Sequence, residues 1–74
     1  MTEVYLFVDD GEESREAIKL LDEKKLRYKK IDVRKNGIRG WLRFEFGTSK
    51  VPILAIKRRI AVGYENIKNI LERY

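Results

Sequence analysis

The chemistry open to this 74-residue chain is limited because it contains no cysteine and no histidine. Without cysteine there is no thiolate to attack a substrate, ligate a metal ion or form a disulfide. Without histidine, the commonest acid–base group near neutral pH is absent. Ser14 carries a hydroxyl, but no histidine or paired lysine is available to activate it. We therefore expect no catalytic residue, no metal site and no cofactor.

Acidic side chains are concentrated in residues 9–13, Asp-Asp-Gly-Glu-Glu. Such a cluster can bind a divalent cation, but this one lacks the alternating ligand spacing of a calcium loop. Asp10 and Glu13 instead have the three-residue separation of a capping box, and the two glutamates place negative charge where a helix dipole favours it. The cluster therefore predicts the start of a helix, with Asp10 as its cap.

Basic residues dominate the remainder of the chain. Residues 1–23 carry a net charge of −6 and residues 24–74 a net charge of +11, which together make +5. A candidate basic patch combines two residues that share a helix face with three at a hairpin tip: Arg39, Arg43, Lys57, Arg58 and Arg59. It fits a solvated, thermophile-like surface, a face for a protein partner, or phosphate contacts with nucleic acid. If the patch binds nucleic acid, the aromatic rings that could stack on bases are those of Phe44, Tyr64 and Tyr74.

Seven segments must position these residues, and we expect them to form one domain over residues 1–74. Strands are predicted at residues 3–8, 26–33, 53–56 and 60–62, and helices from the acidic cluster to about residue 24, at 38–46 and at 65–73. The first two strands are joined through a helix and should be parallel, whereas the last two form an antiparallel hairpin. Trp41 has helical spacing with Ile38 and Leu42, which predicts a core position. The order indicates an α/β fold with helices on both faces of the sheet.

Three segments resemble the glutaredoxin branch of the thioredoxin fold. Residues 26–33 are similar to the second strand of that family, and residues 46–54 to the stretch that leads through Thr-Val-Pro into its third strand. Residues 63–67, Gly-Tyr-Glu-Asn-Ile, resemble the motif that opens its last helix. The resemblance implies a thioredoxin-like βαβαββα fold with a four-stranded mixed sheet flanked by helices. It also implies a cis peptide bond before Pro52, the only proline.

The chain departs from that family at the active site, where glutaredoxins carry Cys-x-x-Cys. Counting from the first strand places the cysteine positions at Glu12 and Arg15, and counting back from the helix places them at Gly11 and Ser14. Neither pair contains sulfur, so thiol–disulfide exchange is excluded. The family's glutathione contacts would fall on Val51, Tyr64, Glu65 and Asn66. The acids of residues 9–13 would repel an anion, so we do not expect glutathione to bind.

The leading functional hypothesis is a glutaredoxin-like protein that has lost its cysteines. It would bind a protein, an extended peptide or a small ligand through the groove beside Val51 and Pro52. The alternative is a module that binds RNA or single-stranded DNA through its basic face. No apolar run approaches the ~20 residues of a membrane span. No signal peptide is apparent, so we expect a cytoplasmic protein. The oligomeric state stays open.

Overall fold

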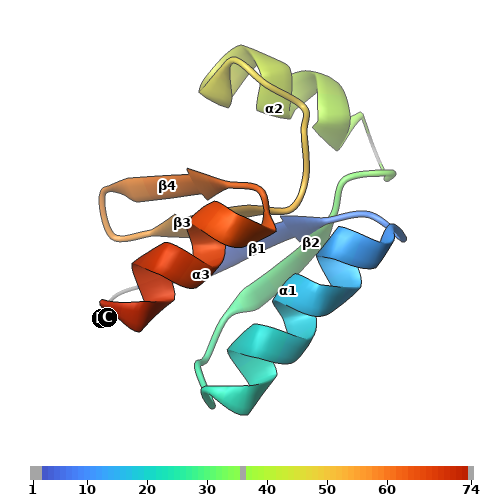
Figure 1. Cartoon of the computed structure of the whole chain (residues 1–74). Coiled ribbons are helices and arrows are strands. Elements are labelled where there is room, and N and C mark those ends of the chain that lie inside the picture. Colours follow the sequence, from blue (N-terminus) through green and yellow to red (C-terminus); the bar gives the residue numbers. More distant parts are fainter. Residues whose placement is uncertain (1–2, 36, 74) are drawn as a thin grey trace.

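Four strands and three helices make up the computed structural model, which describes residues 3–35 and 37–73 (Figure 1). In chain order they are β1 (Val4–Val8), α1 (Glu12–Glu23), β2 (Lys29–Asp32), α2 (Ile38–Phe46), β3 (Ile53–Ile56), β4 (Arg59–Val62) and α3 (Tyr64–Glu72). This is the predicted βαβαββα order. Tyr74, one of the suggested stacking residues, lies outside the described residues. None of the described helices is both long and apolar enough to cross a membrane.

The strands form one mixed sheet in the order β2-β1-β3-β4. β1 runs parallel to β2, with Phe7 opposite Ile31, and antiparallel to β3, with Phe7 opposite Ile53. β3 and β4 form the expected antiparallel hairpin. The two central strands therefore place apolar side chains on both faces, which requires cover on both sides.

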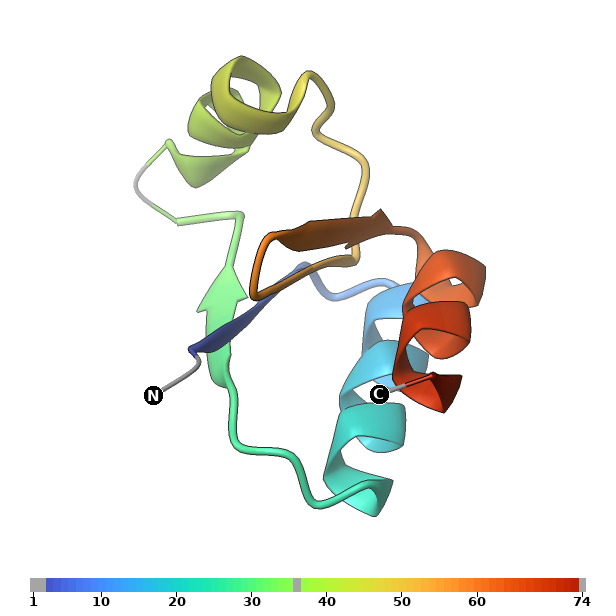
Figure 2. The same ribbon diagram turned by 90° about the vertical axis from the view of Figure 1, so that its left-hand side faces the viewer.

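Helices cover the sheet from both sides, with α1 and α3 on one face and α2 on the other (Figure 2). Leu6 and Leu54 of the central strands are completely buried on the first face, against Leu21 of α1 and Ile67 of α3. On the second face Leu42 of α2 packs in a cluster with side chains of the central strands. The single helix there has nine residues and must cover a face that two helices share on the other side.

The second strand is shorter than the expected 26–33, since β2 comprises only residues 29–32. The preceding residues finish α1. Lys25 has a left-handed backbone with φ of 57°, and the N–H of Leu26 donates to the carbonyl of Leu21 at 3.2 Å. Such bonds satisfy the last carbonyls of a helix, so the chain turns here before it can extend.

Trp41 is not a core residue, contrary to the prediction, because 48% of its surface is exposed. The side chains of Leu42 and Ile38 pack against the sheet, so Trp41 lies at the edge of the apolar face of α2. Its ring lies 5.8 Å from the ring of Phe7 and 5.8 Å from that of Phe46. Trp41 thus forms one wall of an aromatic cluster and faces solvent with its other side.

Candidate functional site beside Val51

Asp9, directly after β1, organises the start of α1. Its Oδ1 accepts hydrogen bonds from the N–H of Gly11 at 2.8 Å and from the hydroxyl of Ser14 at 3.0 Å. α1 begins after Gly11 without a side-chain cap, so the expected capping by Asp10 is wrong. The Gly11 N–H is the main cause that holds the pKa of Asp9 below its usual range. Partial burial opposes this shift in pKa, and Ser14 and Arg39 support it.

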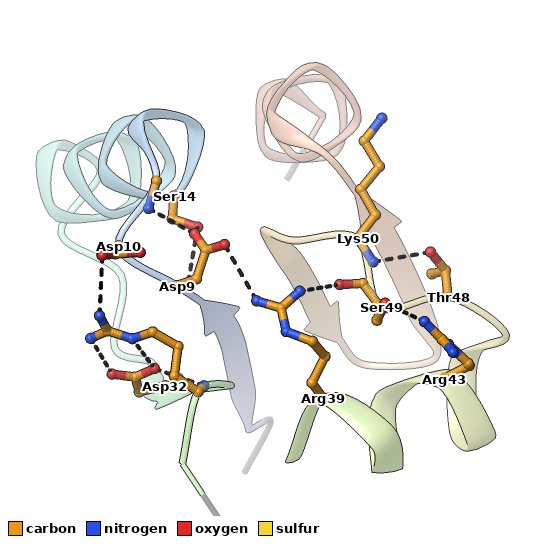
Figure 3. Close-up of polar contacts among 11 residues, drawn as sticks. Asp9, Asp10, Ser14, Asp32, Arg39, Arg43, Thr48, Ser49 and Lys50 are labelled. Carbon is orange, nitrogen blue, oxygen red and sulfur yellow. Dashed lines mark hydrogen bonds and ion pairs between the residues drawn. The ribbon is translucent and has the colours of Figure 1, made fainter. Parts of the chain in front are cut away.

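Arg39 of α2 joins Asp9 to the loop that precedes β3 (Figure 3). Its Nη2 lies 3.5 Å from Oδ2 of Asp9, and its Nη1 donates to the backbone carbonyl of Ser49 at 3.3 Å. Arg43, one helical turn later, donates to Oγ of Ser49 at 3.4 Å. These two arginines of the predicted basic patch therefore hold the loop over residues 48–50 and link it to the start of α1.

A second arginine group is centred on Arg34, which contacts Asp10 and Asp32. Its guanidinium donates to both carboxylate oxygens of Asp32, at 3.0 and 2.7 Å, and lies 3.3 Å from Asp10. The side-chain hydrogen bond between Arg34 and Asp32 is the main cause that holds the pKa of Asp32 well below its usual range and raises the pKa of Arg34. Two of the four acids near α1, Asp9 and Asp10, consequently have arginine partners, which reduces the repulsion of anions inferred from the sequence.

Val51 and Pro52 lie next to this arginine-held loop. The peptide bond between them is cis, as the resemblance implies. Pro52 is buried, and its carbonyl accepts a hydrogen bond from the N–H of Gly63 at 2.7 Å. Val51 is half-buried and packs at the edge of the cluster around Leu42. Within the described residues, neither its N–H nor its C=O has a hydrogen-bond partner.

The start of α3 closes the site from the other side. The N–H of Tyr64 donates to Oε1 of Glu13 at 2.9 Å, which ties the first turn of α3 to the first turn of α1. Gly63 has a φ of 89°, a conformation that favours glycine. Asn66 donates to the carbonyl of Val62 at 2.8 Å, so its amide supports its own helix start. Glu65 is exposed in the same turn.

Two solved structures share this architecture. The crystal structure of a mutant thioredoxin-like protein matches 95% of this chain and 96% of its own with a TM-score of 0.81 and 17% sequence identity. Buckwheat glutaredoxin, in a complex with glutathione, matches 97% of this chain and 70% of its own with a TM-score of 0.82 and 18% identity. No protein-family model and no curated protein matches the chain. The chain has a thioredoxin-like fold.

In this fold, the four positions that the resemblance assigns to Cys-x-x-Cys in its two registers lie around the first turn of α1. Gly11 precedes the helix, while Glu12 and Arg15 are exposed on it. Ser14 is buried, with 1% of its surface exposed, and its hydroxyl both donates to Asp9 Oδ1 and accepts from the Asp9 N–H. That hydroxyl is engaged in holding the helix start. Both cysteine registers remain compatible with this arrangement.

The thioredoxin-like fold divides the predicted basic patch into two groups. Arg39 and Arg43 hold the loop near Val51, whereas Lys57 and Arg58 form the turn between β3 and β4, next to Arg59. Because Ile56 pairs with Val4 at the start of β1 and Asp9 follows the end of β1, these groups lie at opposite ends of the sheet. Lys57 and Arg59 line a separate cavity of 360 Å³ with Arg73.

Several residues of the site had no recognisable signal in the sequence. Ser49, Arg34 and the contact between Glu13 and Tyr64 depend on partners that meet only after folding, so no local spacing marks them. The sequence marks Arg39 only by its charge and by the helix face that it shares with Arg43. Among the residues that the structure describes, no group of three or more acids is arranged to hold a metal ion.

Proposed function

We propose that this chain is a non-catalytic binding domain that holds an extended peptide along Val51. The observation that carries the proposal is the backbone of Val51, whose N–H and C=O have no partner within residues 3–35 and 37–73. A free donor and acceptor on one residue can pair with an extended peptide as a neighbouring strand would. The surrounding loop is braced by Arg39 and Arg43, so little ordering is required when the peptide binds.

The exposed acids at the start of α1 favour a peptide that carries a basic side chain toward that helix. Glu12 and Glu13 are exposed at the start of α1, and the Asp10 side chain is 77% exposed despite its contact with Arg34. Complementary charge at the rim of a binding site speeds association and selects among partners. A lysine or arginine of the peptide would meet this acidic rim when its backbone lies beside Val51.

Glutathione fits the site less well than a peptide does. The first N–H of α3, on Tyr64, already has a carboxylate partner in Glu13, so this end of α3 has less need of an external anion. The chain also has no cysteine with which to form a mixed disulfide. We expect no turnover in an insulin-reduction assay and no measurable binding of glutathione by calorimetry.

The peptide proposal can be tested with random peptides displayed on phage and selected against the immobilised chain. Selected peptides are then titrated into isotopically labelled protein by NMR. We expect the largest amide shifts at residues 49–52, with slower hydrogen exchange at the N–H of Val51. Failure to select any peptide, or shifts confined to other surfaces, would show that the proposal is wrong.

Backbone methylation of the selected peptide provides the sharper test, because it leaves the protein unchanged. Replacing the peptide N–H that donates to the Val51 carbonyl with N–CH₃ should weaken binding about tenfold, the loss expected for one hydrogen bond. Methylation of the neighbouring N–H groups, which point away from Val51 in an extended strand, should have little effect. Equal losses at every position would argue against pairing with Val51.

The second candidate function is nucleic-acid binding at the opposite end of the sheet. The cavity of 360 Å³ lined by Lys57, Arg59 and Arg73 is the observation that favours it. Titration with short RNA or single-stranded DNA at several salt concentrations tests this candidate. Binding that weakens steeply with salt, and that is lost in Arg59→Ala, would support it. Lack of binding at low salt would rule it out.

A further inference from the structure

An open cavity of 270 Å³ lies between α2 and the sheet, and Val51 is not among the residues that line it. Its floor is formed by side chains of β1, β2 and β3, and its wall by Ile38, Trp41 and Phe46 of α2. Every lining residue is apolar or aromatic. The cavity exists because α2 covers this face alone and contacts it through large rings. Trp41 and Phe46 of α2 meet Phe7 of β1, and the centres of the three rings are 5.7–5.8 Å apart.

The size and lining of this cavity suit a protein side chain better than a small-molecule ligand. Ligand pockets usually measure about 300–1,000 Å³ and contain a few polar groups that orient the ligand. This cavity lies below that range. Its one hydroxyl, on Tyr5, already donates to Glu3. An aromatic side chain from another protein surface would fill the space without leaving a polar group unpaired.

An exposed aromatic side chain neighbours the Trp41 wall of the cavity. Phe44 is 86% exposed and follows Trp41 by three positions, so the two are neighbours on the surface of α2. Ile60 of β4, which pairs with Ala55 of the cavity floor, is 48% exposed. With roughly 200 Å² of surface for each large side chain, Phe44, Trp41 and Ile60 expose on the order of 400 Å². A standard interface buries about 800 Å² on each partner, so this patch would supply about half of that area.

Charges at the border of the patch are also self-complementary. The Lys29 Nζ lies 5.9 Å from the centre of the Tyr5 ring, next to the cavity. Glu45, exposed on α2, follows Trp41 by four positions and lies on the same side of the helix. A two-fold axis through the patch would bring Lys29 of each chain toward Glu45 of the other, because a two-fold interface pairs each residue twice.

We propose that a second copy of this chain covers the patch and forms a two-fold dimer. In this dimer Phe44 of each chain enters the cavity beside Trp41 of the other, and Lys29 faces Glu45 across the rim. The site beside Val51 is not part of the contact, so dimerisation and peptide binding are separate properties.

Sedimentation velocity over a concentration series tests the dimer directly, at about 0.15 M salt to screen the net charge of each copy. Trp41 is the only tryptophan of the chain, so its fluorescence should shift to shorter wavelength as the dimer forms. The variant Phe44→Lys should raise the dissociation constant at least about tenfold, because it removes an aromatic anchor from both halves. Asn69→Lys, on the exposed side of α3, adds the same charge and should leave the dimer unchanged.

Charge reversal distinguishes this dimer from other self-association. Lys29→Glu and Glu45→Lys should each weaken the dimer, and the double variant should restore it. A wild-type chain that stays monomeric at all concentrations overturns the proposal. A dimer that Phe44→Lys does not weaken, or one that the double charge reversal does not restore, overturns it as well. Far-ultraviolet circular dichroism verifies that each variant is folded.

Discussion

The side chain of Glu13 accepts a hydrogen bond from the backbone N–H of Tyr64, 51 positions later in the chain. This contact joins the first turn of α1 to the first turn of α3, on the face of the sheet that the two helices share. It also gives an unpaired donor of the α3 start an anionic partner. Glu13, which the sequence places in the first turn of α1, therefore also supports the first turn of α3.

Glu13→Ala should lower the free energy of unfolding by about 1 kcal/mol, since one hydrogen bond to a charged acceptor is lost at a partly exposed site. Glu12→Ala is the matched control, because Glu12 occupies the same first turn of α1 and makes the same type of interaction with the helix dipole. Urea unfolding of both variants measures the difference. Equal losses would mean that the contact with Tyr64 contributes nothing beyond the dipole.

Arg39→Ala should loosen the loop before Val51 more than it destabilises the fold. Arg39 is exposed and its ion pair with Asp9 should contribute less than ~1 kcal/mol. Loss of its bond to the Ser49 carbonyl should nevertheless speed hydrogen exchange at the amide of Lys50, whose N–H donates to Oγ1 of Thr48 at 3.1 Å. Arg58→Ala in the β3–β4 turn is the control. Unchanged exchange beside Val51 would show that Arg39 does not brace this loop.

The pKa of Asp9 is lowered in the folded chain, which makes stability depend on pH in acid. A carboxylate with a depressed pKa contributes stability above its unfolded value of about 3.9 and loses it as pH falls toward the folded pKa. The free energy of unfolding should therefore decline below about pH 4. Asp9→Asn keeps an oxygen for Gly11 and Ser14 but removes the charge, so its decline should be shallower. Parallel curves for both proteins would contradict this assignment.

The Tyr28 hydroxyl should lose its proton only at high pH. Burial is the main cause that raises the pKa of Tyr28 to about 12, and the hydrogen bond to Asp22 is the second cause. A folded pKa above the unfolded value of about 10 means that the contribution of Tyr28 to stability is complete below pH 10 and is lost as pH rises through the folded pKa. Tyrosinate absorbance of the wild type and of Tyr28→Phe isolates this titration. In Asp22→Asn the titration should shift downward in pH. A Tyr28 titration near pH 10 would refute the prediction.

Local patterns predicted the elements well where one face of a segment is apolar. The helix at residues 38–46 has the expected bounds, because the spacing of Ile38, Leu42 and Phe46 defines it and Gly47 ends it with a left-handed backbone. The strand at 53–56 also has the expected bounds. The second strand was overestimated because the closing turn of α1 extends to Leu26, and that turn has no distinctive residue such as glycine.

Side-chain partners across the fold were not predictable in the same way. Asp10 fitted the spacing of a cap, yet Asp9 holds the helix start because Ser14 is close enough to share its carboxylate. Trp41 fitted the apolar periodicity of its helix, yet it is half exposed because Leu42 faces the sheet more directly. Periodicity predicts which side of a helix is apolar, and only packing decides how far that side is covered.

The sequence by itself determined the order of the elements, the likeness to a thioredoxin-type fold and the absence of thiol chemistry. These follow from residue types and from spacings of a few positions, which the chain retains in any conformation. Only the tertiary structure decided that Arg39 links Asp9 to Ser49, that Glu13 meets Tyr64 and that Trp41 lines an open apolar cavity. Such contacts join residues distant in the chain, and their geometry depends on how the helices pack on the sheet.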